Sequence, residues 1–159
     1  MAHQYRREGE AAQKGADQAL DLSQQQGFPH RLATAYDVRG WARASLGHQE
    51  GIEEIEQGIG TWVATGPRQT EPYFLGMLAE SCRKVRRPED GLRKVNSAIQ
   101  KVEALQEHFQ EAELHRIEGD LLLSLNGTST GKNKSKRTTE AEECFHKALE
   151  IARRQKAKS

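Results

Sequence analysis

The chain has 159 residues, of which 24 are basic and 23 acidic, giving a net charge of +1. This length suits one domain, and the balanced charge excludes a general electrostatic attraction to nucleic acid or to a membrane surface. Hydrophobic residues are 35% and charged residues 30% of the chain, an apolar share that is typical of a thin molecule with much surface.

Apolar runs are short throughout the sequence. Residues 121–123, for example, are three leucines, whereas a helix that crosses a bilayer needs about 20 apolar residues. Residues 1–7 lack the apolar core of a secretory signal. We therefore expect no membrane association and a cytoplasmic location.

Seven helices and no strand are predicted from the breaks in the apolar pattern. In chain order the helices span residues 5–26, 31–46, 49–64, 72–85, 88–105, 109–125 and 140–156. The breaks coincide with Pro29, Pro67, Pro72 and Pro88, which suit helix boundaries because proline lacks the backbone N–H of a helix interior.

Residues 126–138 separate the last two predicted helices and are polar, without apolar periodicity. We expect them to form an inserted polar loop. Thr139 and Glu142 have the spacing of a capping box, in which the two side chains bond the first free backbone N–H groups of a helix. This motif would start the last helix.

Small residues recur along the chain at spacings of 39, 40 and 50 residues. A glycine or alanine lets two helix axes approach closely, and larger neighbours then fill the space between them. One series of small residues lies in the second helix of each predicted hairpin and the other in the first helix. The first series is Ala12, Gly51, Gly91 and Ala141, each followed four positions later by Ala16, Ile55, Val95 or Phe145; the second is Gly40, Ala79 and Gly119.

This repetition predicts three helical hairpins preceded by one lone helix. A single hairpin cannot bury its apolar face, but stacked hairpins can. We therefore expect an all-α helical-hairpin repeat solenoid that forms one domain over residues 1–159.

Several motifs resemble the tetratricopeptide repeat, in a variant of about 40 residues. They are the pair Gly40 and Gly47, the couplets at residues 51–52 and 58–59, and the string Arg-Pro-Glu-Asp-Gly-Leu at residues 87–92. The strings at residues 39–42, 72–75, 112–116, 119–123 and 148–155 are similar to the C-terminal repeat region of bacterial class III adenylate or guanylate cyclases. The similarity covers about residues 26–159.

The resemblance implies a protein-interaction or regulatory module of a bacterial multidomain signalling protein. In that family a cyclase domain and an ATPase domain precede the repeats, and this chain contains the residues of neither. The alternative that the residues leave open is a structural module that self-associates through its end helices into a homo-oligomer.

No group of residues predicts catalysis, so we expect no enzyme, no cofactor and no metal site. The glycines Gly127 and Gly131 before Lys132 are too close together for a phosphate-binding loop, and no two histidines have the i, i+4 spacing of metal ligands. Cys82 and Cys144 lie within helical patterns, where a cysteine is usually a small core residue.

A concave groove for a protein or peptide partner is the site that the resemblance implies. In the tetratricopeptide family, positions two, five, nine, twelve and thirteen of each repeat line this groove. The candidate groove residues are Trp41, Tyr73, Arg83, Lys84, Arg116, Asp37, Glu80 and Asp120, together with Thr34 and Glu113. The open alternative is that Trp41 packs between hairpins and that the arginines pair with neighbouring glutamates.

Overall fold

In the computed structural model of the protein, the described residues are 9–27, 29–65, 68–106, 108–126 and 132–156. These residues form helices and turns and contain no strand, so the predicted all-α class is confirmed for them. The α-helices are α2 (Gly9–Gln26), α3 (Pro29–Ser45), α4 (Glu50–Thr65), α5 (Glu71–Lys84), α6 (Pro88–Leu105), α7 (Glu111–Leu125) and α8 (Lys132–Lys156). Two short 3-10 helices, η1 (Arg68–Thr70) and η2 (His108–Gln110), directly precede α5 and α7.

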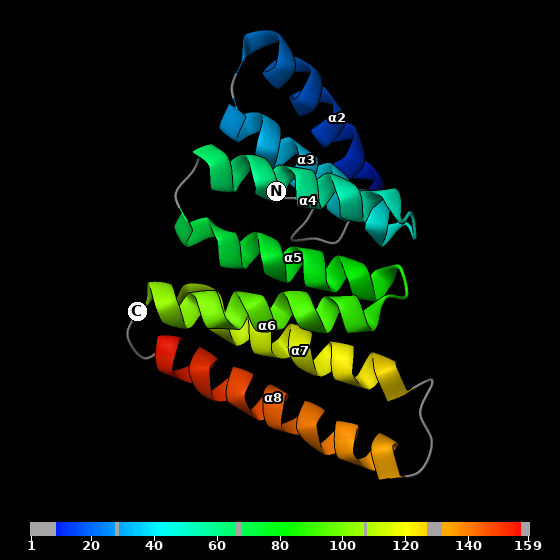
Figure 1. The fold of residues 1–159 in the computed structure, drawn as a ribbon, viewed down its shortest axis with the longest axis vertical. Helices are drawn as coiled ribbons and strands as arrows, with labels where there is room; N and C mark the ends of the chain where they lie inside the picture. Colours follow the sequence, from blue (N-terminus) through cyan, green and yellow to red (C-terminus); the bar gives the residue numbers. More distant parts are fainter. Residues whose placement is uncertain (1–8, 28, 66–67, 107, 127–131, 157–159) are drawn as a thin grey trace.

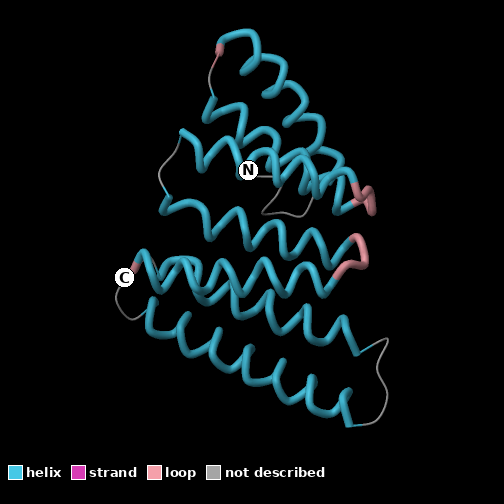
Figure 2. The backbone as a smooth tube through the Cα atoms, viewed as in Figure 1, coloured by secondary structure: helices cyan, strands magenta, loops and turns pink. Residues whose placement is uncertain are grey.

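The helices stack in chain order from α2 to α8 (Figure 1). Each helix contacts the next one, and α3 also contacts α5, which in turn contacts α7. The short turns within the hairpins α3–α4 and α5–α6 lie on the same side of the stack (Figure 2). The first helices of the three hairpins, α3, α5 and α7, therefore form one continuous layer.

Tight turns reverse the chain within the first two hairpins. Gly47 adopts a φ of 90°, a left-handed conformation that glycine reaches without strain, and the N–H of His48 donates to the carbonyl of Arg43 at 3.0 Å. The second turn has Arg86 at a φ of 63°, and Pro88 is the first residue of α6. Both turns therefore bring the second helix back along the first.

The predicted small residues lie where the helices approach most closely. A Cβ on Gly40 would overlap the carbonyl oxygen of Gly51 and lie 2.9 Å from the backbone nitrogen of Ile55. In the last hairpin, a Cβ on Gly119 would lie 2.6 Å from the Phe145 ring. Because a side chain at these positions would force the helices apart, the prediction of closely packed hairpins is confirmed.

Two apolar clusters fill the interior of the stack. The first joins α2, α3, α4 and α5 around residues such as Ile55 and Leu78, and the second joins α5, α6 and α7 around Leu114 and Leu121. The half-buried side chain of Ile59 contacts both clusters. The interior is therefore continuous along this part of the stack.

The predicted loop at residues 126–138 is wrong over its second half, because α8 begins at Lys132. Thr139 is not a cap: its hydroxyl donates to the carbonyl of Ser135 at 3.3 Å, within the helix. The first turns of α8 are exposed, so they need no apolar residues, and Lys136 and Glu140 form an i, i+4 ion pair at 3.5 Å. Residues 127–131 of the predicted loop lie outside the described residues.

Candidate functional site

A pocket of about 430 Å³ crosses the layer of first helices, and we call it the inner groove. It draws residues from all three hairpins, so it exists only when the hairpins stack. Its lining is Trp41 from α3, Tyr73, Gly76, Met77 and Glu80 from α5, Phe109 and Gln110 from η2, and Glu113, Leu114 and Ile117 from α7.

Buried apolar residues form one side of the inner groove. Trp41 is only 3% exposed, and the ammonium group of Lys84 lies 5.6 Å from the centre of its ring, within range of a cation–π interaction. Gly76 lets α7 lie close to α5, since a Cβ there would be 2.7 Å from the Leu114 side chain. Close packing around these residues holds this side of the groove in place.

Phe109 is the most exposed large apolar side chain in the described part of the chain, at 83%. Exposed aromatic rings are costly in water and frequently mark binding surfaces. Sequence analysis placed Phe109 at the start of a helix and did not assign it to the groove. The signal that could have identified it is one aromatic residue among polar neighbours, at the first position of a predicted helix.

Three acidic side chains surround Arg116 at the end of the inner groove. Its guanidinium donates to Glu113 at 2.7 and 2.9 Å and to Asp120 at 2.5 Å. The hydrogen bonds to Glu113, together with the charges of Asp120 and Glu80, hold the pKa of Arg116 above its usual range. Arg116 is thus engaged within the protein and holds Glu113 in position, as the open alternative described.

Besides Arg116 and Asp120, which bond each other, the candidate residues from the sequence divide into three groups in the structure. Trp41, Tyr73 and Glu80 line the inner groove together with Glu113. Lys84 lies over the Trp41 ring, and the guanidinium Nε of Arg83 is buried on the same helix without a hydrogen-bond partner among the described residues. The third group, which lies elsewhere, consists of Asp37 and Thr34.

Asp37 does not reach the inner groove, which corrects its assignment. It is fully buried at the contact between α3 and α4, and neither carboxyl oxygen has a hydrogen-bond partner among the described residues. Burial raises the pKa of Asp37 to about 8, although the nearby indole N–H of Trp62 lowers it without reaching hydrogen-bond geometry. The repeat position at which we expected a groove residue, occupied here by Asp37, lies on the face of α3 that contacts α4.

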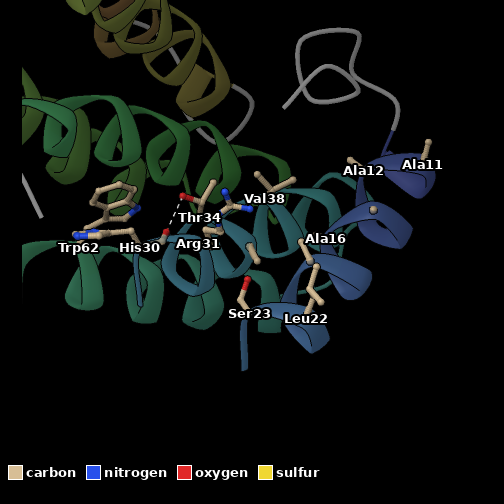
Figure 3. A pocket seen from close by; sticks show the side chains of 13 residues that line it. Ala11, Ala12, Ala16, Leu22, Ser23, His30, Arg31, Thr34, Val38 and Trp62 are labelled. Carbon is tan, nitrogen blue, oxygen red and sulfur yellow. Dashed lines mark hydrogen bonds between the residues drawn. The ribbon is translucent and has the colours of Figure 1, made fainter. Parts of the chain in front are cut away.

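A second pocket, of about 490 Å³, lies between α2 and α3, and we call it the N-terminal pocket (Figure 3). Thr34 lines it, and the ring of His30 lies 5.1 Å from that of Trp62 at one end. The small side chains of α2, such as Ala12 and Ala16, lie at the other end. Few polar groups converge in this pocket, so its chemistry is mainly that of an apolar surface.

Both cysteine thiols have raised pKa values in this fold. His115 is buried and its Nδ1 lies 3.0 Å from a carboxylate oxygen of Glu118, which in turn faces Cys144. Burial, with the Glu118 charge, raises the pKa of the Cys144 thiol to about 12, and burial raises that of Cys82 to about 11. A thiol with so high a pKa is a poor nucleophile at neutral pH.

The same described residues contain no group of three or more His, Cys, Asp or Glu side chains placed to hold a metal ion. None of their helices is long and apolar enough to cross a bilayer.

Comparison of the chain with protein-family models, with curated proteins and with solved structures found no match. The inner groove combines three aromatic side chains with charged residues at its rim.

Proposed function

We propose that the chain is a tetratricopeptide-type repeat solenoid that binds a segment of a partner protein in the inner groove. One observation carries the proposal: Trp41, Tyr73 and Phe109, from three successive hairpins, line a single pocket of about 430 Å³. Tryptophan and tyrosine are among the residues that dominate binding free energies at protein interfaces. The position of the pocket on the layer of first helices further supports this function.

The lining of the groove suggests the chemistry of the partner segment. An apolar side chain of the partner would cover Phe109 and fill the space beside Tyr73, because burying these surfaces is favourable. The carboxylate of Glu113, held by Arg116, would accept hydrogen bonds from the partner's polar groups at the rim. We expect a short peptide segment with one bulky apolar anchor to be sufficient.

Within this proposal the chain is the cytoplasmic regulatory region of a bacterial multidomain signalling protein such as a nucleotidyl cyclase. The support is the sequence similarity of the strings between residues 39 and 155 to the repeats that follow the cyclase and ATPase domains. Partner binding would pass a signal to a neighbouring catalytic domain. The proposal gives the chain itself no catalytic activity, cofactor or metal.

Selection of peptides from a displayed random library by the purified chain tests the proposal. Calorimetry of the selected peptides should show that Phe109→Ala and Tyr73→Ala each weaken binding about tenfold or more. Val63→Ala is the matched control, because Val63 is 47% exposed on α4 and does not line the groove. Equal binding by all four proteins would contradict the groove, and turnover of ATP by the chain would contradict the non-catalytic role.

Structural self-association is the second candidate function, and a specific observation favours it. A pocket of about 440 Å³ between α7 and α8 is lined mainly by apolar side chains, among them Phe145 and Leu149. An apolar face of this kind on an end hairpin is suited to a protein contact.

A further inference from the structure

The hairpin α7–α8 is the next repeat after the hairpin α5–α6. One face of the second helix is covered by a following helix in α6, whereas the equivalent face of α8 has no following helix in the described part of the chain. Residues of α8 correspond to residues of α6 at a spacing of 50, so Phe145 is equivalent to Val95 and Leu149 to Ile99. On α6 this face is covered by α7. One apolar cluster joins Val95, Ala98 and Val102 of α6 with Leu114, Ile117 and Leu121 of α7 and with two residues of α5, and Ile99 packs against this cluster.

On the equivalent side of α8, Phe145 packs against Gly119 of α7, and no third described helix covers the residues around Leu149. Leu149 is 53% exposed, whereas its equivalent Ile99 is half-buried against the apolar cluster of α5, α6 and α7. The uncovered surface forms the 440 Å³ pocket, whose apolar lining is Phe109, Ala112, Phe145, Ala148, Leu149 and Ala152. The repeat thus indicates what this surface fits, namely a helix that runs antiparallel to α8, as α7 runs antiparallel to α6.

Five residues along α8 form a stripe on its open face, and we call them the α8 stripe: Glu142, Phe145, Leu149, Ala152 and Lys156. They recur at spacings of three and four residues, so they share one side of the helix. Their pattern is complementary in chemistry about Leu149, and its two charged ends are symmetric in position. Glu142 lies seven residues before it and Lys156 seven residues after it, while bulky Phe145 lies on one side and small Ala152 on the other.

We propose that the α8 stripe binds the α8 stripe of a second copy of this chain, with the two helices antiparallel around a twofold axis at Leu149. In this arrangement Glu142 lies opposite Lys156 of the second copy and the two Leu149 side chains meet. Phe145 lies beside Ala152 of the second copy, which is one residue from the position directly opposite. Neither Glu142 nor Lys156 has an ion pair among the described residues, so both are free to form one between copies.

The proposal gives the self-association function a definite surface, and it rests on that function rather than on peptide binding. The occupant is a second copy because the stripe is complementary to itself in charge and in size. Such self-complementarity is the requirement of a symmetric dimer interface, in which each contact occurs twice.

Sedimentation equilibrium of the 159-residue chain tests the proposal directly. The expected mass at high concentration is twice the 17.9 kDa of one chain. Leu149→Glu should raise the dimer dissociation constant by about a hundredfold, because two carboxylates would meet at the axis. Val63→Glu, a change at a similarly exposed residue on α4, should leave the dimer intact. Far-UV circular dichroism should show unchanged helix content for both variants.

Charge reversal tests the antiparallel register. Glu142→Lys alone and Lys156→Glu alone should each raise the dissociation constant about tenfold, because like charges then face each other twice in the dimer. The double variant carrying both changes should regain the original affinity. A double variant as weak as the single ones would overturn the register.

Three further outcomes would overturn the proposal. The first is a monomer at every concentration, and the second is a dimer that persists in Leu149→Glu. The third is a monomeric chain that binds a synthetic peptide of residues 108–125, which would assign the surface to a helix of a different protein. Peptide binding in the inner groove is measured independently of dimerisation. If Leu149→Glu is a monomer that still binds the selected peptides, peptide binding does not depend on the dimer.

Discussion

The carboxyl group of Asp37 lies against Gly58 in the fully buried contact between α3 and α4. A Cβ placed on Gly58 would be 2.6 Å from the carboxyl carbon of Asp37 and 2.9 Å from the carbonyl oxygen of Ala33. The glycine therefore makes room for a buried acid.

Gly58→Ala should lower the free energy of unfolding by about 1 to 3 kcal/mol, because the added methyl group overlaps the Asp37 side chain. The matched control is Gly60→Ala, two residues later on the same helix, where nothing lies within 4 Å of the added Cβ. There the better helix propensity of alanine should stabilise the protein by up to about 1 kcal/mol. Urea unfolding followed by circular dichroism measures both, and equal effects of the two changes would contradict the close contact.

Asp37→Asn should remove a pH dependence of stability. The folded-state pKa of Asp37 is raised to about 8, whereas an unfolded aspartate titrates near about 4. The folded protein therefore holds a proton that the unfolded chain releases, so the contribution of Asp37 to stability is greatest below about pH 4 and falls until about pH 8. The asparagine variant keeps a neutral side chain throughout, and above about pH 8 it should be more stable by a few kcal/mol.

Urea unfolding at pH 5 and at pH 9 measures this effect. The difference in unfolding free energy between the two proteins should widen at the higher pH, in favour of the variant. Parallel curves for Asp37→Asn and the unchanged protein would contradict a buried, protonated Asp37.

Both thiols should react slowly with iodoacetamide at neutral pH. Burial raises the pKa of Cys82 to about 11 and that of Cys144 to about 12, so the reactive thiolate is scarce. We expect labelling of the folded protein to be about a hundredfold slower than that of a free cysteine. Glu118→Gln should speed labelling of Cys144 but not of Cys82, since the Glu118 charge contributes to the raised pKa of Cys144 alone. Mass spectrometry separates the two sites, and fast labelling of either in the unchanged protein would contradict the prediction.

Glu54 joins α4 to two arginines of α3, and its removal should destabilise the hairpin. Its carboxylate accepts from Arg39 at 2.9 Å and from Arg43 at 2.5 Å, and its side chain is only 12% exposed. Glu54→Ala should lower the free energy of unfolding by about 1 to 2 kcal/mol, because two charge-assisted hydrogen bonds are lost.

The matched control for Glu54 is Glu53→Ala, at an exposed neighbour without an ion pair among the described residues. Its effect should be within about 0.5 kcal/mol. Thermal unfolding of both variants at low and high salt provides the measurement. If the loss of stability in Glu54→Ala changes little with salt, the ion pairs of Glu54 are shielded from solvent. A control variant as unstable as Glu54→Ala would contradict the specific role of Glu54.

Sequence predicted the helices and their close contacts well because both depend on local signals. Pro88 begins α6 as expected, and the register of Gly40 with Gly51 indicated which faces of α3 and α4 meet. The loop at residues 126–138 was predicted too long, because the absence of apolar residues was interpreted as absence of a helix. An exposed helical turn requires helix propensity and ion pairs but no apolar face.

The candidate site was predicted only in part. Trp41, Tyr73 and Glu80 do meet at one pocket, while Asp37 turns into the α3–α4 contact and Arg116 is held by its own neighbours. Phe109 was missed because it lines the groove only when α5 and α7 pack beside η2, and this packing cannot be read from the sequence.

By itself, the sequence determined the helical class, the hairpin repeat and the small residues at which helices meet, since spacing along one chain fixes which residues share a helix face. Only the tertiary structure decided that Asp37 is buried, that Phe109 lines the inner groove and that the α8 stripe is uncovered. The reason is physical: burial, pKa and exposure depend on what neighbouring helices bring to a residue, and no local pattern carries that information.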